Sequence, residues 1–225
     1  MSPRPFRLHL VRHGQTHANV SGALDTSMPG LDLTDLGRAQ ARAASRALAQ
    51  VPVTGIYVSK LVRTHQTAAP LAALSGLEPT HLPGIHEISA GQFEMATDRE
   101  SVHGYITSVT NWIGGNWDYR MPGGETGAEF VERYTADVET IAADGHEEAL
   151  LVSHGAAIRT WLSSVLPDLA ASPQATAPLH NTAHITVQGH PSTGWELVQW
   201  TGDPVGGAYL EDEAAADPTG DVTGD

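Results

Sequence analysis

Two short apolar runs, each ending in a histidine followed by a glycine, place the strongest constraint on the fold of this chain. They are residues 8–14 (LHLVRHG) and residues 149–155 (ALLVSHG). Short apolar runs bounded by turn-forming residues are typical of buried strands in a parallel sheet. Ligands of open α/β sheets bind at the carboxyl ends of such strands. We therefore expect His13 and His154 to share one pocket at an edge of the sheet.

The rest of the chain alternates between helical and strand-like patterns, which predicts an α/β protein. Thr34 and Thr126 are expected to cap helices, and the spacing from Thr126 to Glu129 fits a capping box. The expected helices run from Thr34 to about 50, from about 60 to 75, from Asp98 to about 114, from Thr126 to about 143, and onward from Gly155; further strands are expected at 55–58, 182–188 and 195–201.

A series of segments resembles the histidine phosphatase superfamily, the group that includes phosphoglycerate-mutase-like enzymes. In the order of that family they are 11–16 (VRHGQT) with Asn19, 33–37 (LTDLG) with Gln40-Ala41, 59–68 (SKLVRTHQTA), His86-Glu87, 123–126 (GGET) and 152–155 (VSHG). Each segment is too short to indicate the family alone. The resemblance comes from the presence of all of them in the order of the family. One difference is Met95 in the segment Phe93-Glu94-Met95, where the family pattern is of a Trp-Glu-Gly type.

The resemblance implies a three-layer α/β/α sandwich with a mostly parallel central sheet, phosphoglycerate-mutase-like, with an inserted lid region. We expect one domain over residues 1–205, with the lid at about 92–125. Residues 206–225 are expected to form an acidic, disordered tail. Six of the 26 acidic residues lie in 211–225, a stretch that shows no periodicity.

The resemblance also implies a role for each residue of the pocket. His13 is expected to be the nucleophile that becomes phosphohistidine, and Glu87 the general acid and base. His154 is expected to hold the transferring phosphoryl group as a charged donor. The full expected set is His13, Glu87, His154, Arg12 and Arg63 for catalysis, and Arg12, Asn19, Arg63, His154, Gly155 and Gln15 for substrate binding.

Elementary chemistry agrees with these roles. A neutral imidazole has a free lone pair near pH 7, and arginine matches phosphate oxygens with a fixed fork of donors. Arg63 taken alone would fit a surface ion pair better, but its expected place in the first turn of a helix, together with the surrounding resemblance, favours a phosphate site. The expected reaction is hydrolysis of a small phosphate monoester without a metal or another cofactor.

Three alternatives stay open. A cofactor-dependent phosphoglycerate-type mutase would share the phosphohistidine, but the region between Arg63 and Arg133 offers only Arg99 and Arg120 besides histidines, which favours the phosphatase. A pseudoenzyme would only bind phosphorylated partners. A metal-dependent phosphohydrolase would need ligands such as His13, His86, His154, His180 and His184.

Composition limits the remaining classes. The net charge is −14 and the basic residues are eleven arginines and one lysine, so nucleic acid is not an expected partner. The absence of cysteine excludes a thiol nucleophile. No run of eighteen apolar residues or secretory signal is visible, so we expect no membrane partner and a soluble, cytoplasmic protein, with a homodimer as a possible assembly.

Overall fold

A six-stranded sheet forms the centre of the molecule. The computed structural model describes residues 4–169, 172, 174 and 177–220. The strands follow the order β3-β2-β4-β1-β5-β6; the first four are parallel, β5 runs antiparallel to β1, and β6 runs antiparallel to β5. The mostly parallel sheet is therefore confirmed. The strands are β1 (Phe6–Arg12), β2 (Gly55–Val58), β3 (Thr80–His81), β4 (Glu148–Ser153), β5 (His184–His190) and β6 (Gly194–Thr201).

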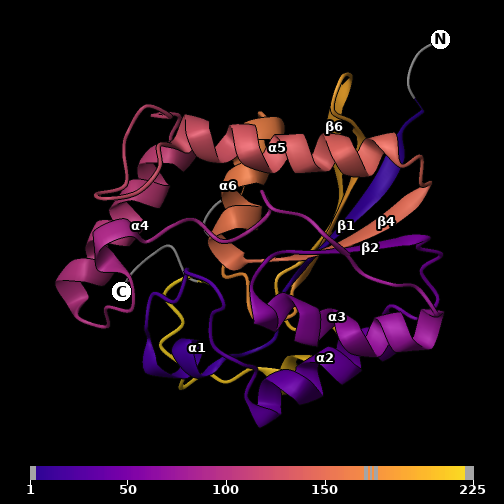
Figure 1. Ribbon diagram of the computed structural model, residues 1–225, viewed down its shortest axis with the longest axis horizontal. Helices are drawn as coiled ribbons and strands as arrows, with labels where there is room; N and C mark the ends of the chain where they lie inside the picture. The colour runs from indigo at the N-terminus through magenta and orange to yellow at the C-terminus, as the bar shows by residue number, and fades with distance from the viewer. Residues whose placement is uncertain (1–3, 170–171, 173, 175–176, 221–225) are drawn as a thin grey trace.

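Helices cover both faces of this sheet, which confirms the three-layer sandwich (Figure 1). On one face lie α4 (Arg99–Ile113), α5 (Gly127–Ala143) and α6 (Gly155–Val165); on the other lie α2 (Asp35–Ala47) and α3 (Val62–Ser75), with the short α1 (His17–Ser21) beside them. Short 3-10 helices, η1 (Gly91–Phe93) and η4 (Ala208–Leu210), also lie within the described residues. Among the described residues, no helix is both long enough and apolar enough to cross a bilayer.

The register between β1 and β4 brings the two histidines together. The strands are parallel, and Arg12 pairs with Ser153 at their carboxyl ends. His13 and His154 are the first residues after these strands, and the His13 amide donates to the Ser153 carbonyl at 3.0 Å. The pocket expected from the sequence therefore follows directly from strand pairing.

Side-chain caps start three of the helices; those at Thr34 and Thr126 were expected, and the one at Asp98 is additional. The side chains of Thr34, Asp98 and Thr126 accept hydrogen bonds from the amides of Gly37, Ser101 and Glu129, and Thr126 and Glu129 form a capping box.

The inserted region is packed into the helical layer of the first face. Within it, Trp112 is fully buried and its ring stacks on Phe130 with centroids 6.1 Å apart. Its indole nitrogen donates to the Tyr119 carbonyl at 2.7 Å. Trp112 is thus part of the core rather than a wall open to substrate, and the role of residues 92–125 as an inserted lid stays a prediction.

The C-terminal segment differs from the expected disordered tail as far as Gly220. It contains η4, and the Gln40 side chain donates to the Leu210 carbonyl at 2.8 Å. Leu210 and Thr219 are buried. Composition predicted disorder because the stretch is acidic and without periodicity, but here its carboxylates meet cations of the folded body, as described below. Residues 221–225 lie outside the described part of the chain.

Candidate active site

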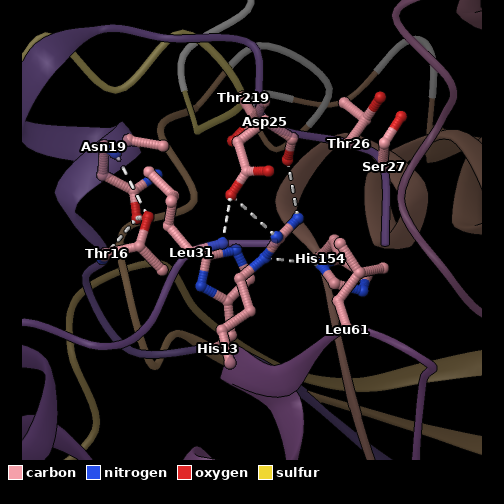
Figure 2. A network of polar contacts seen from close by, with 12 residues as sticks. His13, Thr16, Asn19, Asp25, Thr26, Ser27, Leu31, Leu61, His154 and Thr219 are labelled. Atoms are coloured by element: carbon pink, nitrogen blue, oxygen red, sulfur yellow. Dashed lines mark hydrogen bonds and ion pairs between the residues drawn. The ribbon is translucent and has the colours of Figure 1, made fainter. Parts of the chain in front are cut away.

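The imidazoles of His13 and His154 face each other at the ends of β1 and β4, with ring centroids 5.3 Å apart (Figure 2). His13 Nδ1 lies 2.7 Å from the Gly14 carbonyl oxygen. A carbonyl can only accept, so Nδ1 carries the proton and Nε2 keeps the free lone pair. Burial, followed by the charges of Arg63 and Arg12, holds the pKa of His13 well below its usual value. His13 is therefore neutral at pH 7, as a nucleophile must be.

Gly14 allows this turn because a larger residue would not fit. A Cβ placed on Gly14 would lie 2.7 Å from the Gly37 carbonyl oxygen, and a Cβ on Gly37 would lie 2.1 Å from the Gln15 carbonyl oxygen. The two glycines thus let the loop after β1 press against the start of α2. The segments VRHGQT and LTDLG, which are separate in the sequence, are thus packed against each other through these two glycines.

His154 is oriented by Ser59 and Arg63. Its Nε2 lies 2.8 Å from Ser59 Oγ, and its Nδ1 accepts a hydrogen bond from Arg63 Nε at 3.3 Å. Burial and the charge of Arg63 lower the pKa of His154 well below its usual value. In this state His154 is a neutral acceptor, whereas the sequence led us to expect a charged donor. The reason is that buried guanidinium groups oppose a further positive charge.

Each guanidinium of the pocket is paired with a carboxylate. Arg12 is completely buried, and its two terminal nitrogens donate to Asp217 at 2.6 and 2.5 Å. Arg12 also donates to the Leu179 carbonyl at 2.7 Å. Arg63, in the first turn of α3 as expected, lies 3.3 Å from an Asp25 carboxylate oxygen. A buried cation needs such a partner because desolvation is costly.

The expected binding residues divide into two groups. Asn19 directs its amide nitrogen to Asp217 at 2.7 Å, while its oxygen accepts from the Thr16 amide at 2.8 Å. Gly155 lies directly against Arg12, since a Cβ there would be 3.0 Å from Arg12 Nε. Gln15 instead points to the C-terminal segment and donates to Asp212 at 2.8 Å. Asn19 and Gly155 therefore adjoin the guanidinium of Arg12, and Gln15 lies at the rim.

Glu87 has the environment of a carboxylic acid. It is 1% exposed, and its Oε1 accepts hydrogen bonds from the amides of Ile88 and Ala157, both at 2.9 Å. Its Oε2 has no partner among the described residues. Burial raises the pKa of Glu87, opposed by these amides and by the charges of Arg63 and Arg12. A protonated Oε2 would have a hydrogen to donate to a ligand.

Arg133 holds the backbone of the Glu87 loop, and the sequence analysis did not identify it. Its guanidinium donates to the carbonyls of Gly84, His86 and Glu87, the last at 3.1 Å. It also pairs with both carboxylate oxygens of Glu125, at 2.6 and 2.8 Å. One available indication was that Arg133 is the single basic residue of α5.

Glu94 organises the loop on the other side of Arg63. Its carboxylate accepts from the amides of Thr26 and Ser27, both at 2.9 Å, and from the Thr26 hydroxyl. The next residue, Met95, has a φ of 60°, in the left-handed region that favours glycine. Methionine in place of the glycine of the family pattern therefore leaves a strained backbone at residue 95. The Glu94 carboxylate still accepts its hydrogen bonds from Thr26 and Ser27.

Of the histidines considered as metal ligands, His13 and His154 lie together, but His180 and His184 pair with other residues. His184 Nε2 lies 3.0 Å from His9 Nδ1 inside the sheet, and His180 pairs with Glu211 at 3.0 Å. Within the described ranges, no group of three or more histidine, aspartate or glutamate side chains has a geometry that could hold a metal ion. The metal-dependent alternative thus has no ligand set in this part of the chain.

Sequence comparison gives relatives with related chemistry. A model of the histidine phosphatase superfamily (branch 1) matches residues 8–203. A probable phosphoglycerate mutase of Proteus mirabilis is 31% identical over 206 residues, which cover 88% of this chain and 93% of that protein. The adenosylcobalamin/alpha-ribazole phosphatase of Salmonella typhimurium is 32% identical over 174 residues, 74% of this chain and 83% of that protein. The PE-PGRS family protein PE_PGRS11 of Mycobacterium tuberculosis is 39% identical over 220 residues, 90% of this chain but only 38% of that protein.

Structural comparison agrees with the sequence. A mycobacterial glucosyl-3-phosphoglycerate phosphatase, solved with VO3, is 26% identical with a TM-score of 0.74, and the match covers 87% of this chain and 98% of that one. A phosphoglycerate mutase of Bacillus anthracis, 19% identical with a TM-score of 0.72 over 91% of this chain and 96% of that one, shares the fold. The fold, the paired histidines and the nearly full-length family match together show that this chain belongs to the histidine phosphatase superfamily.

Proposed function

We propose that this chain hydrolyses a small phosphate monoester through a phosphohistidine on His13, with Glu87 as general acid and base. The observation that carries the proposal is the His13 ring: its Nδ1 is committed to the Gly14 carbonyl, and its centroid lies 5.3 Å from that of His154. The lone pair on Nε2 is then available to phosphorus, between guanidinium groups that can balance the charge of the phosphoryl oxygens.

In the first step, His13 Nε2 forms a bond to phosphorus while the bond from phosphorus to the ester oxygen breaks. An alkoxide is a poor leaving group, so its oxygen must receive a proton. Glu87 Oε2, buried and otherwise without a partner in the described structure, supplies that proton. The products are an alcohol, phosphohistidine and an ionised Glu87.

In the second step, water attacks phosphorus and gives its proton to Glu87, while the bond from phosphorus to Nε2 breaks. Inorganic phosphate leaves, and both residues return to their starting states. Arg12, Arg63, Asn19 and His154 bind the phosphoryl oxygens. A bound phosphate dianion favours protonation of His154, which would convert Nδ1 from an acceptor into a donor.

Hydrolysis is favoured over transfer to a second hydroxyl because the site has few additional cations for a sugar acid. Arg120 is exposed and committed to Glu129 at 3.0 and 3.1 Å. Arg99 is exposed at the start of α4. The phosphoryl pocket is bordered instead by the carboxylate of Asp25, 3.3 Å from Arg63. A phosphoglycerate, which adds a carboxylate to the phosphate, would meet repulsion there.

A panel of phosphate monoesters, assayed with and without a chelator, tests the proposal. We expect phosphate release that survives chelation, is inhibited by vanadate and is lost in His13→Ala. Acid-labile phosphate should be trapped on His13. Turnover that stops with chelator would instead support the metal-dependent reaction, and transfer to phosphoglycerate without phosphate release would support a mutase.

We further propose that the substrate is a small molecule and that the protein works in the cytoplasm. A homodimer also remains a prediction. Cell fractionation tests the cytoplasmic location. Light scattering after size-exclusion chromatography tests the homodimer.

A further inference from the structure

The carboxylate of Asp217 lies where the proposed mechanism needs a phosphoryl group. Its two oxygens accept from the two terminal nitrogens of Arg12, and Oδ1 also accepts from the Asn19 amide nitrogen at 2.7 Å. Arg12 and Asn19 are the residues expected to bind phosphate oxygens. A carboxylate and a phosphate monoester present similar acceptors to an arginine fork, so one can replace the other.

Several contacts hold the segment around Asp217 against the pocket. The Asp217 amide donates to the Asn19 carbonyl at 3.1 Å, and the Leu179 amide donates to the Gly220 carbonyl at 3.1 Å. Thr219 Oγ1 accepts from Arg12 at 3.1 Å, and Figure 2 shows Thr219 beside the site. At the beginning of the segment, Glu211 pairs with His180, and Asp212 accepts a hydrogen bond from Gln15. The segment is thus attached at both of its ends.

This arrangement leaves no room for substrate at Arg12. His13 and Arg12 are 2% and 0% exposed. The backbone of the segment touches the guanidinium so closely that a Cβ on Gly220 would lie 2.2 Å from Arg12 Nη1. The two terminal nitrogens of Arg12 can therefore bind a phosphoryl group only after Asp217 has left them.

We propose that residues 211–220 form an internal competitive inhibitor, in which Asp217 occupies the phosphate site and substrate binds by displacing it. The inference rests on the proposed roles of Arg12 and Asn19. It makes the apparent affinity for substrate equal to the intrinsic affinity multiplied by the fraction of molecules in which the segment is displaced.

Displacement by a phosphate monoester is physically reasonable. The carboxylate carries one negative charge, whereas the ester carries about two and can also contact Arg63 and His154. The Asp217 side chain keeps 18% of its surface exposed, so water has access to it. The segment is therefore a weaker ligand than a dianion that fills the whole pocket.

The test compares wild type with Asp217→Asn by calorimetric titration with inorganic phosphate. Loss of the charge weakens the contact with Arg12, and we expect the phosphate dissociation constant to fall about tenfold. The matched control is Glu213→Gln, which removes one charge from the same segment at an exposed side chain for which the described structure shows no ion pair. This control should bind phosphate like wild type.

Hydrogen exchange on the full-length wild type provides a second measurement. Saturating inorganic phosphate should accelerate exchange of the amides of Asp217 and Leu179, which in the closed arrangement donate to the carbonyls of Asn19 and Gly220 and so join the segment to the folded body. Equal or weaker phosphate binding by Asp217→Asn, or unchanged exchange, would overturn the inference. Tighter phosphate binding by Asp217→Asn without hydrolysis of any ester would sustain the inference and refute the proposed phosphatase.

Discussion

Replacement of Glu87 by glutamine separates proton transfer from every other property of this side chain. Glutamine has the same shape, and its carbonyl oxygen can take the place of Oε1 as acceptor for the amides of Ile88 and Ala157. The NH2 of its side-chain amide can donate a hydrogen bond where Oε2 lies, but it cannot release a proton. The variant should therefore fold and bind phosphate while losing general acid catalysis.

The size of the loss depends on the leaving group. A positioned general acid contributes about 10²–10⁴ in rate, so kcat for an alkyl phosphate should fall by about that factor in Glu87→Gln. For p-nitrophenyl phosphate, whose phenolate leaves without a proton, the first step should change little. Measurement of the burst of phenolate and of the following steady state separates the two steps.

The same variant should change stability with a defined sign. Because burial raises the pKa of Glu87 above its ordinary value of 4.5, the native state keeps this proton at pH values where the unfolded chain has lost it. Wild type then loses about 1.4 kcal/mol of stability per pH unit from about pH 4.5 up to the native pKa. Glu87→Gln lacks this loss, so it should be the more stable protein at pH 7, and the difference should shrink below pH 4.5.

Urea unfolding of both proteins from pH 4 to pH 8 measures this difference. The reasoning fails if the two stability curves stay parallel over the whole range. It also fails if Glu87→Gln slows the first step, measured by the release of alcohol or phenolate, by the same factor for alkyl and nitrophenyl phosphates, because the proton would then come from elsewhere.

Substitutions at three further positions test the scaffold by thermal and urea unfolding. Met95→Gly should stabilise the protein by about 0.5–1 kcal/mol, because glycine removes the strain of a φ of 60° and the methionine side chain is half exposed; a loss of stability would contradict this. Gly37→Ala should cost about 1–3 kcal/mol through its clash with the Gln15 carbonyl, and an unchanged midpoint would refute the close packing. Arg133→Ala should cost about 3 kcal/mol by leaving Glu125 unpaired, and Arg133→Lys should restore only part, since lysine lacks the planar fork; full rescue by lysine would count against the role given to that fork.

The positions of His13 and His154 could be predicted because strand pairing is encoded locally. Two apolar runs that end in the same motif place the two histidines side by side if the strands are parallel neighbours. The pairing of Arg12 with Ser153 confirms that they are. The caps at Thr34 and Thr126 were predictable for the same reason, since each depends on neighbours within three residues.

The partners of the buried cations could not be predicted in this way. Asp217 reaches Arg12 across 205 positions of sequence, and Asp25 reaches Arg63 across 38. No periodicity marks either aspartate, because each lies in irregular chain, and the composition around Asp217 pointed instead to disorder. Such contacts depend on the complete fold and on the cost of leaving a buried guanidinium unpaired.

The imidazoles of His13 and His154 directly follow adjacent strands, and this placement has a consequence for the diversity of such enzymes. Neighbouring strands are held about 4.8 Å apart by their ladder of hydrogen bonds, close to the 5.3 Å between the two rings. The spacing of the reacting groups is thus inherited from the stiffest part of the molecule. Insertions and terminal extensions can remodel the entrance, and with it the choice of ester, while the reaction centre keeps its dimensions.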